Sequence, residues 1–206
     1  YSLFFCGALM SYHWILSISA NIFRLKNSIL MITIRQAHPD DSKVLAYIAK
    51  HTFRETFATK KNLTDMEFHC SKNFGTEIQR QEILDPNCAT ILAEVEGQLV
   101  AFAQVRLHSP KECVAADLSS ELHRLYVGKE WHGRGVAHKL MSRILSTASD
   151  AGADHIWLGV WEHNPRAIAF YGKYGFRVVG EHTFQFGSDP QRDLVMMAEV
   201  NESLIA

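Results

Sequence analysis

The chain has 206 residues, of which 47% are hydrophobic and 21% charged, and its 21 basic and 22 acidic residues give a formal net charge of -1. That length suits one domain and supplies enough apolar side chain for a sizeable core, which argues against disordered, collagen-like and coiled-coil classes. Broad nucleic-acid binding requires a basic surface. A near-neutral chain therefore predicts no nucleic-acid partner.

Cysteine and histidine spacing argues against structural metal or disulfide frameworks. The four cysteines, Cys6, Cys70, Cys88 and Cys113, are widely separated and form no C-x-x-C pair. Eleven histidines are present, but none forms an H-x-x-x-H or H-E-x-x-H pair. We expect reduced thiols, a cytoplasmic location and no metal site.

The first thirty residues differ in composition from the rest. Residues 1–23 contain no Asp, Glu, Lys or Arg, 16 of them are apolar, and Arg24 and Lys26 follow directly. This apolar extension (1–30) could be a leader without function, a single membrane anchor, or a segment that packs or contacts a partner. Its serines and His13 dilute the hydrophobicity, so a leader is favoured over an anchor. Met31 begins the segment 31–206, which we interpret as one domain.

From Met31 onward, strand-like and helix-like patterns alternate without an internal repeat or linker. Asp40 or Asp41 is expected to cap the first helix, and Glu96, Gly97 and Gln98 give a hairpin signal. The pattern predicts a single α+β domain. The expected strands are 32–35, 89–94, 99–107, 122–127, 155–160, 176–180 and 193–200, and the expected helices begin near 40 and span 63–84 with a break near Gly75, 135–149 and 165–173.

A strand that runs into a glycine-containing loop and then a helix is the most informative stretch. The loop reads His132-Gly133-Arg134-Gly135-Val136-Ala137. Gly133 and Gly135 allow close backbone approach to a ligand, and the helix start adds a positive dipole end, so the loop suits phosphate. His132 and Arg134 can add charge-assisted contacts. The loop matches neither the nucleotide P-loop nor the dinucleotide fingerprint, and alone it is also typical of a tight turn.

A second motif follows about thirty residues later. It carries Asn164, Ala167, Tyr171, Gly175 and Phe176 in the order N-x-x-A-x-x-x-Y-x-x-x-G-F. The two motifs together resemble the GNAT superfamily of acyl-CoA-dependent N-acetyltransferases, although His132 stands where that family usually has Gln or Arg. The resemblance spans essentially all of 31–200.

The resemblance implies a fold and a co-substrate. It implies a mixed, twisted sheet, flanked by helices, whose central parallel strands splay apart to admit the pantetheine arm of acetyl-CoA. The backbone of Leu125, Tyr126 and Val127 would pair with the pantetheine amides, and Asn164 would contact the arm from the other side. The loop residues His132, Gly133, Arg134, Gly135, Val136 and Ala137 would bind the pyrophosphate.

The resemblance also implies direct acetyl transfer to an amine in a ternary complex. Tyr171 matches the family's thiolate-protonating tyrosine and is also counted among the cofactor-binding residues. A phenol is protonated at neutral pH. For the base, three residues remain open: Glu121 and His123, two apart at the start of a strand, and Glu162 after the other strand. Ordered water without a dedicated base is the fourth option.

The acceptor is the least determined feature. A small amine or polyamine is favoured, a protein N-terminus or lysine is an alternative, and a catalytically silent acyl-CoA sensor is the rival class. The acceptor site is expected between Asp40 and Leu84, where carboxylates could steer a polycation. The carboxylates that could steer a polycation are Glu55, Asp65, Glu67 and Glu77.

The family makes a homodimer possible, and no membrane partner is expected.

Overall fold

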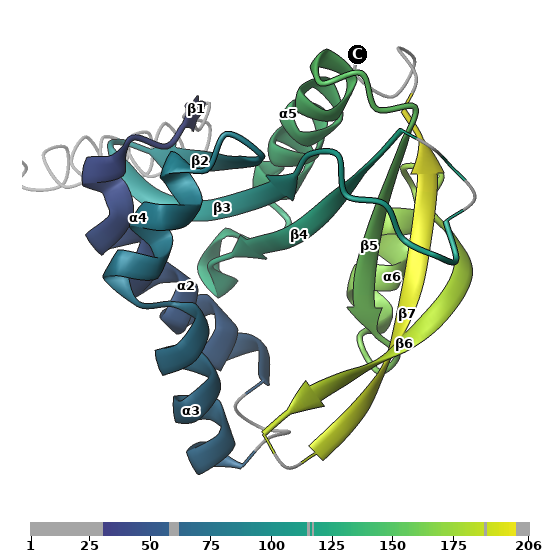
Figure 1. The fold of residues 1–206 in the computed structure, drawn as a ribbon. Coiled ribbons are helices and arrows are strands. Elements are labelled where there is room, and N and C mark those ends of the chain that lie inside the picture. Colours follow the sequence, from purple (N-terminus) through teal and green to yellow (C-terminus); the bar gives the residue numbers. More distant parts are fainter. Residues whose placement is uncertain (1–30, 58–61, 115, 117, 188, 201–206) are drawn as a thin grey trace, which may run out of the picture. The chain divides into compact units, whose positions relative to one another are not determined.

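Seven strands form one mixed sheet in the computed structural model, with the order β1-β2-β3-β4-β5-β7-β6 (Figure 1). The model describes residues 31–57, 62–114, 116, 118–187 and 189–200. The predicted extension 1–30 therefore lies outside the described residues. Among those described, no helix is long and apolar enough to cross a membrane. The strands are β1 (Ile32–Gln36), β2 (Cys88–Val95), β3 (Gln98–Arg106), β4 (Ser119–Val127), β5 (His155–Trp161), β6 (Arg177–Phe186) and β7 (Asp189–Glu199).

Helices cover the sheet on both faces, with α5 on one side and α2 and α4 on the other (Figure 1). On α5, Leu140, Met141, Ile144 and Leu145 are fully buried because their spacing places them on one helical face. The helices are α2 (Ser42–Phe57), α3 (Leu63–Asn73), α4 (Thr76–Leu84), α5 (Val136–Asp150) and α6 (Pro165–Gly172), with 3-10 turns η1 (Pro39–Asp41) and η2 (Lys129–Trp131).

The central strands β4 and β5 run parallel but pair only at their beginnings. Three residue pairs connect them, from Ser119↔His155 to Glu121↔Trp157, and beyond Glu121 the two strands diverge. On its other edge β4 stays paired with β3 as far as Val127. The splay therefore leaves one edge of β4 without a strand partner among the described residues.

A β-bulge accompanies this divergence. Val105 of β3 pairs with Leu122, and Gln104 pairs with Arg124, so His123 is the extra residue of β4. Bulges bend a strand, increase its twist and redirect a side chain. This one places His123 where β4 turns away from β5.

Most predicted elements are present, and the differences have local reasons. The helix break predicted near Gly75 is present: α3 ends at Asn73, Phe74 is buried, and Gly75 is the N-cap of α4. The last strands are much longer than predicted and form one hairpin. The prediction that Asp40 or Asp41 caps the first helix is wrong, because both residues lie in the turn η1 that precedes α2. His38 is the N-cap of that turn, and the Asp41 carboxylate accepts from the His38 backbone N–H at 2.7 Å.

Candidate active site

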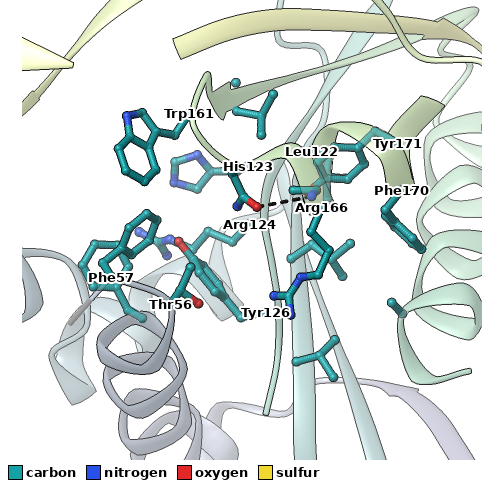
Figure 2. A pocket seen from close by; sticks show the side chains of 18 of the residues that line it. Thr56, Phe57, Leu122, His123, Arg124, Tyr126, Trp161, Arg166, Phe170 and Tyr171 are labelled. Atoms are coloured by element: carbon teal, nitrogen blue, oxygen red, sulfur yellow. Dashed lines mark hydrogen bonds between the residues drawn. The ribbon is translucent and has the colours of Figure 1, made fainter. Parts of the chain in front are cut away.

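A cleft of about 740 Å³ lies at the splay between β4 and β5. Its walls come from α2, α3, α4, β3, β4, the loop before α5, β5, α6 and the β6–β7 hairpin. Figure 2 shows Trp161 and Phe57 toward one end, Tyr171 and Phe170 toward the other, and His123 between them. We call the first the α2 end and the second the α6 end.

The loop before α5 has the conformation expected of an anion site. Gly133 and Gly135 have φ values of +74° and +83°, which favour glycine over residues with a Cβ. Gly135 is the N-cap of α5, and no side chain caps this end. The positive end of a 15-residue helix thus borders the cleft, which Gly133, Gly135, Val136 and Ala137 line.

His132 connects this loop to two other elements. Its Nε2 lies 2.9 Å from the carbonyl oxygen of Val127, and its Nδ1 lies 2.8 Å from Nη1 of Arg166 on α6. A carbonyl and a guanidinium have fixed roles as acceptor and donor, so Nε2 carries the proton and Nδ1 accepts. His132 therefore holds the Arg166 guanidinium beside the loop.

Helix α6 contributes Asn164 and Tyr171 to the cleft. Asn164 is the N-cap, and its Oδ1 accepts from the backbone N–H of Ala167 at 3.2 Å. Burial, with a smaller contribution from Tyr126, raises the pKa of Tyr171 well above its ordinary value. Its hydroxyl thus stays protonated across the neutral range.

His123 and Glu121 form a hydrogen-bonded pair on β4. Nδ1 of His123 lies 3.2 Å from Oε1 of Glu121, and Arg106 Nη1 lies 3.4 Å from the other oxygen. Burial opposes ionisation of Glu121, but the hydrogen bond from His123 and the charges of His123 and Arg106 outweigh it and hold its pKa below the usual range. An ionised Glu121 only accepts, so His123 Nδ1 carries the proton.

The second nitrogen of His123 has the properties of a base. Nε2 is buried, and among the described residues no group bonds to it. Burial lowers the pKa of His123, although its hydrogen bond to Glu121 opposes this, so the ring is neutral at pH 7. His123 thus lines the cleft with a buried, unpartnered lone pair on Nε2 and the Glu121 carboxylate bonded to its other nitrogen.

Several residues predicted for the site lie outside the cleft lining of the described chain. Glu121 contacts the cleft only through His123. Arg134 lies with its guanidinium carbon 5.2 Å from the centroid of the Trp131 ring. Glu162 pairs with Arg192 at 3.1 Å. Leu125, Tyr126 and Val127 do line the cleft, along the unpaired edge of β4.

The four carboxylates expected to steer a polycation do not line the cleft either. Glu67 pairs with Arg54 at 2.8 Å, and Glu77 accepts from Gln81 at 2.7 Å. Glu55 lies 3.2 Å from the backbone nitrogen of Lys129. Asp65 on α3 is likewise absent from the lining residues. The segment between Asp40 and Leu84 does line the cleft, through residues such as Phe57 and His69, and the steering of a polycation by its carboxylates stays a prediction.

Other residues of the cleft were not predicted from the sequence. Arg166 lies inside the second motif, where its charge next to Asn164 could have been noticed. Arg124 donates to Glu82 at 2.7 Å and 2.9 Å, and Asp193 lies on β7. Arg124 and Glu82 lie 42 positions apart, so no local pattern indicates this pair.

The open edge of β4, the uncapped start of α5 and the Arg166 guanidinium together fit a ligand with amide groups and phosphates, as in coenzyme A. The described residues contain no group of three His, Cys, Asp or Glu side chains placed to hold a metal ion.

Comparison with known proteins assigns the family. Residues 46–176 match the Acetyltransferase (GNAT) family. An uncharacterized N-acetyltransferase of Mycobacterium tuberculosis (strain ATCC 25618 / H37Rv) is 32% identical over 160 residues, covering 78% of this chain and 98% of that protein. One from Lactobacillus delbrueckii subsp. lactis is 26% identical over 165 residues, covering 80% of this chain and 95% of that protein.

Solved structures share the fold. The PaiA N-acetyltransferase of Thermoplasma acidophilum, solved in complex with coenzyme A, has a TM-score of 0.68 at 21% identity and covers 82% of this chain and 99% of its own. The family match and the relatives' coverage agree with the splayed sheet, the glycine loop and the α6 motif. The chain therefore belongs to the GNAT family and is an acetyl-CoA-dependent N-acetyltransferase.

Proposed function

We propose that this enzyme acetylates the primary amine of a small molecule, with His123 as the base and Tyr171 as the acid. The observation that carries the proposal is the joint presence of both side chains in one cleft at the splay of β4 and β5. Their protonation states at neutral pH are complementary, because His123 is neutral and Tyr171 is protonated. Glu121 positions His123 and does not itself contact the acceptor.

The binding roles follow from the two ends of the cleft. The open edge of β4 at Leu125, Tyr126 and Val127 suits pantetheine amides, and Asn164 faces the same space. The loop 132–137 and Arg166 suit the pyrophosphate. The acceptor then enters from the α2 end and reaches His123 before Tyr171, in the order that Figure 2 shows.

Acetyl-CoA supplies a thioester, whose acetyl group forms a C–N bond with the amine as the C–S bond breaks. Nε2 of His123 takes one proton from the acceptor ammonium and passes it to solvent. Tyr171 gives its hydroxyl proton to the departing sulfur and regains the second proton that the nitrogen loses. Proximity of the two substrates supplies much of the rate, because the amine attacks without a covalent enzyme intermediate.

Named relatives support an amine acceptor but differ in its identity. A probable spermine N(1)-acetyltransferase of Bacillus subtilis subsp. natto is 28% identical over 90 residues, and the match covers 59% of that protein. A 5-NmdU N-acetyltransferase of Pseudomonas phage PaMx11 is 28% identical over 152 residues, covering 91% of that protein. These names favour low-molecular-weight amines over protein N-termini or lysines.

The test is acetyl transfer to a panel of amines, with the product identified by mass spectrometry. We expect Tyr171→Phe and His123→Ala each to lower kcat by about 100-fold or more, the usual contribution of a positioned acid or base. Binding of acetyl-CoA should persist in both. Tyr47→Phe, on the exposed face of α2, removes the same hydroxyl away from the cleft and should keep wild-type rates. Full activity of Tyr171→Phe and His123→Ala would refute these roles.

A further inference from the structure

The α2 end of the cleft is walled mainly by aromatic rings. They come from four separate elements and contact one another: ring centroids are 4.7 Å apart for Phe53 and Phe57, and 6.1 Å apart for Phe57 and Trp161. Phe53 also lies 6.2 Å from Tyr126. The rings that define this aromatic chamber are the half-buried Phe57, Tyr126, Trp161 and Phe184, packed against the buried core residues Phe53 and Phe186.

The cationic groups around the chamber are neutralised by neighbouring carboxylates. Arg124 donates twice to Glu82, and Arg106 pairs with Glu121. His69, which stacks on Phe53 at 4.5 Å, has its pKa lowered to about 4 by burial and by the nearby charges of Arg124 and Lys72, so it is neutral at pH 7. The chamber thus offers flat apolar faces rather than a field of negative charge.

Two carboxylates line the cleft, Glu82, which pairs with Arg124, and Asp193. Asp193 of β7 lines it, and its Oδ2 lies 3.8 Å from the point where a Cβ on Gly159 would be. The same Cβ would approach Cε1 of His182 to 2.9 Å, which real Cβ atoms essentially never do. Glycine at 159 therefore leaves β5 without a side chain beside the Asp193 carboxylate.

We propose that the acceptor is a primary monoamine that carries an aromatic ring on a short alkyl chain. The aromatic chamber binds the ring by offset and edge-to-face contacts, and Asp193 attracts the ammonium group toward His123. A polyamine would have to place a second ammonium group among these rings, where the carboxylates of Glu82 and Glu121 are already paired with Arg124 and Arg106. This inference rests on the proposed function, since it names the substrate class of the same site.

The test compares kcat/KM for 2-phenylethylamine, benzylamine and tryptamine with that for spermidine, lysine and propylamine in the full chain. We expect the best arylalkylamine to exceed spermidine and propylamine by at least about tenfold, which corresponds to about 1.4 kcal/mol. Trp161→Leu should raise KM for the arylalkylamines about tenfold and leave KM for propylamine unchanged within about twofold. Binding of acetyl-CoA to Trp161→Leu, measured separately, establishes that the variant is folded.

Asp193→Asn gives an independent measurement that does not involve the rings. It should raise KM for every amine by a similar factor, because all of them carry the ammonium group. Preferential acetylation of spermidine or lysine, or an unchanged amine preference in folded Trp161→Leu, would overturn the inference and leave the proposed function standing. Tight acetyl-CoA binding with no acetylated amine at all would overturn both.

Discussion

At the scale of single residues, the Glu121–His123 pair predicts a specific pH dependence. Glu121 raises the pKa of His123, in opposition to burial, through its hydrogen bond and its charge. Glu121→Gln removes that charge, so the pKa of His123 falls further and the acid limb of the kcat/KM profile moves to lower pH. The rate at the plateau should fall about tenfold, because the amide no longer fixes the ring in one orientation.

A purely structural role for Glu121 would lower the rate without moving the acid limb. Glu162→Gln provides the matched control, since it removes the same charge from a carboxylate that pairs with Arg192 outside the cleft lining. That variant should leave the position of the acid limb unchanged. A shift toward higher pH in Glu121→Gln would contradict the pairing.

Residue patterns in the sequence predict part of this site. The contacts that they miss depend on a bulge or on residues far apart in the sequence. The two-residue period of a strand correctly suggests that Glu121 and His123 could meet, but it does not reveal the bulge that makes His123 the extra residue. The order of Glu121 behind His123 also depends on that bulge. The bond between His132 and Arg166 joins residues 34 positions apart, so neither motif alone predicts it.

At the scale of elements, α3 is attached to the domain partly through a neutral histidine. His69 stacks on Phe53 of α2, and its folded-state pKa of about 4 lies below the ordinary 6.5. A depressed folded-state pKa contributes stability that is fully present above pH 6.5 and is lost as the pH falls toward 4. Because the His69 ring is partly exposed, we expect the free energy of unfolding to fall by about 2 kcal/mol between pH 6.5 and pH 4.

His69→Phe tests this contribution, because phenylalanine keeps the aromatic stacking and cannot be protonated. Urea unfolding at several pH values should show a flatter dependence between pH 6.5 and 4 in the variant than in the wild type. Parallel curves for the two proteins would mean that His69 is protonated equally in the folded and unfolded states.

The connection between α5 and α6 is a second prediction at this scale. His132 accepts from Arg166 and donates to the Val127 carbonyl, so His132→Leu removes both contacts from the loop that we propose binds the pyrophosphate. Loss of a charge-assisted bond that holds a cation in place should raise KM for acetyl-CoA about tenfold. The chemistry at His123 and Tyr171 is untouched, so kcat should change little. Steady-state kinetics with acetyl-CoA varied at saturating amine measures both, and a fall in kcat at constant KM would contradict this role.

Helix and strand positions followed from the sequence more closely than the cleft did. The spacing of Leu140, Met141, Ile144 and Leu145 predicts α5 to within one residue at each end, because its apolar face is continuous. The β6–β7 hairpin was predicted too short, although the alternation of Phe184, Gln185 and Phe186 is itself a strand signal. That hairpin brings Phe184, Phe186 and Asp193 to the cleft, and hence the acceptor end was the part least accessible to sequence analysis.

At the scale of the whole domain, the splay makes β4 serve two purposes. One edge of the strand holds the sheet together through β3, and the other is left open beyond Glu121. Because backbone groups away from water require partners, an open edge in the middle of a sheet costs stability unless a ligand or solvent satisfies it. The strands β4 and β5 are therefore unpaired in the region where we expect the co-substrate to bind.

Hydrogen exchange measured by mass spectrometry tests this arrangement directly. Coenzyme A at about 100 times its Kd should slow exchange in the peptides that cover 119–137 by up to about 100-fold, because the ligand must leave before those amides open. Peptides that cover 88–106, on β2 and β3, provide the internal comparison, since both edges of that region are already paired. Equal protection of both regions would indicate general stabilisation instead of pairing at the open edge.

Two fragments of coenzyme A, measured in the same way, distinguish protection of β4 from protection of the loop 132–137. Pantetheine lacks the nucleotide, so it should protect the residues of β4 and leave the amides of 132–137 close to their free rates. Adenosine 3′,5′-diphosphate lacks the pantetheine arm, so it should protect the loop and the start of α5 but not β4. Protection of β4 by the nucleotide alone would mean that the open edge closes by a change in the sheet, and the assignment of Leu125, Tyr126 and Val127 to the pantetheine arm would then be wrong.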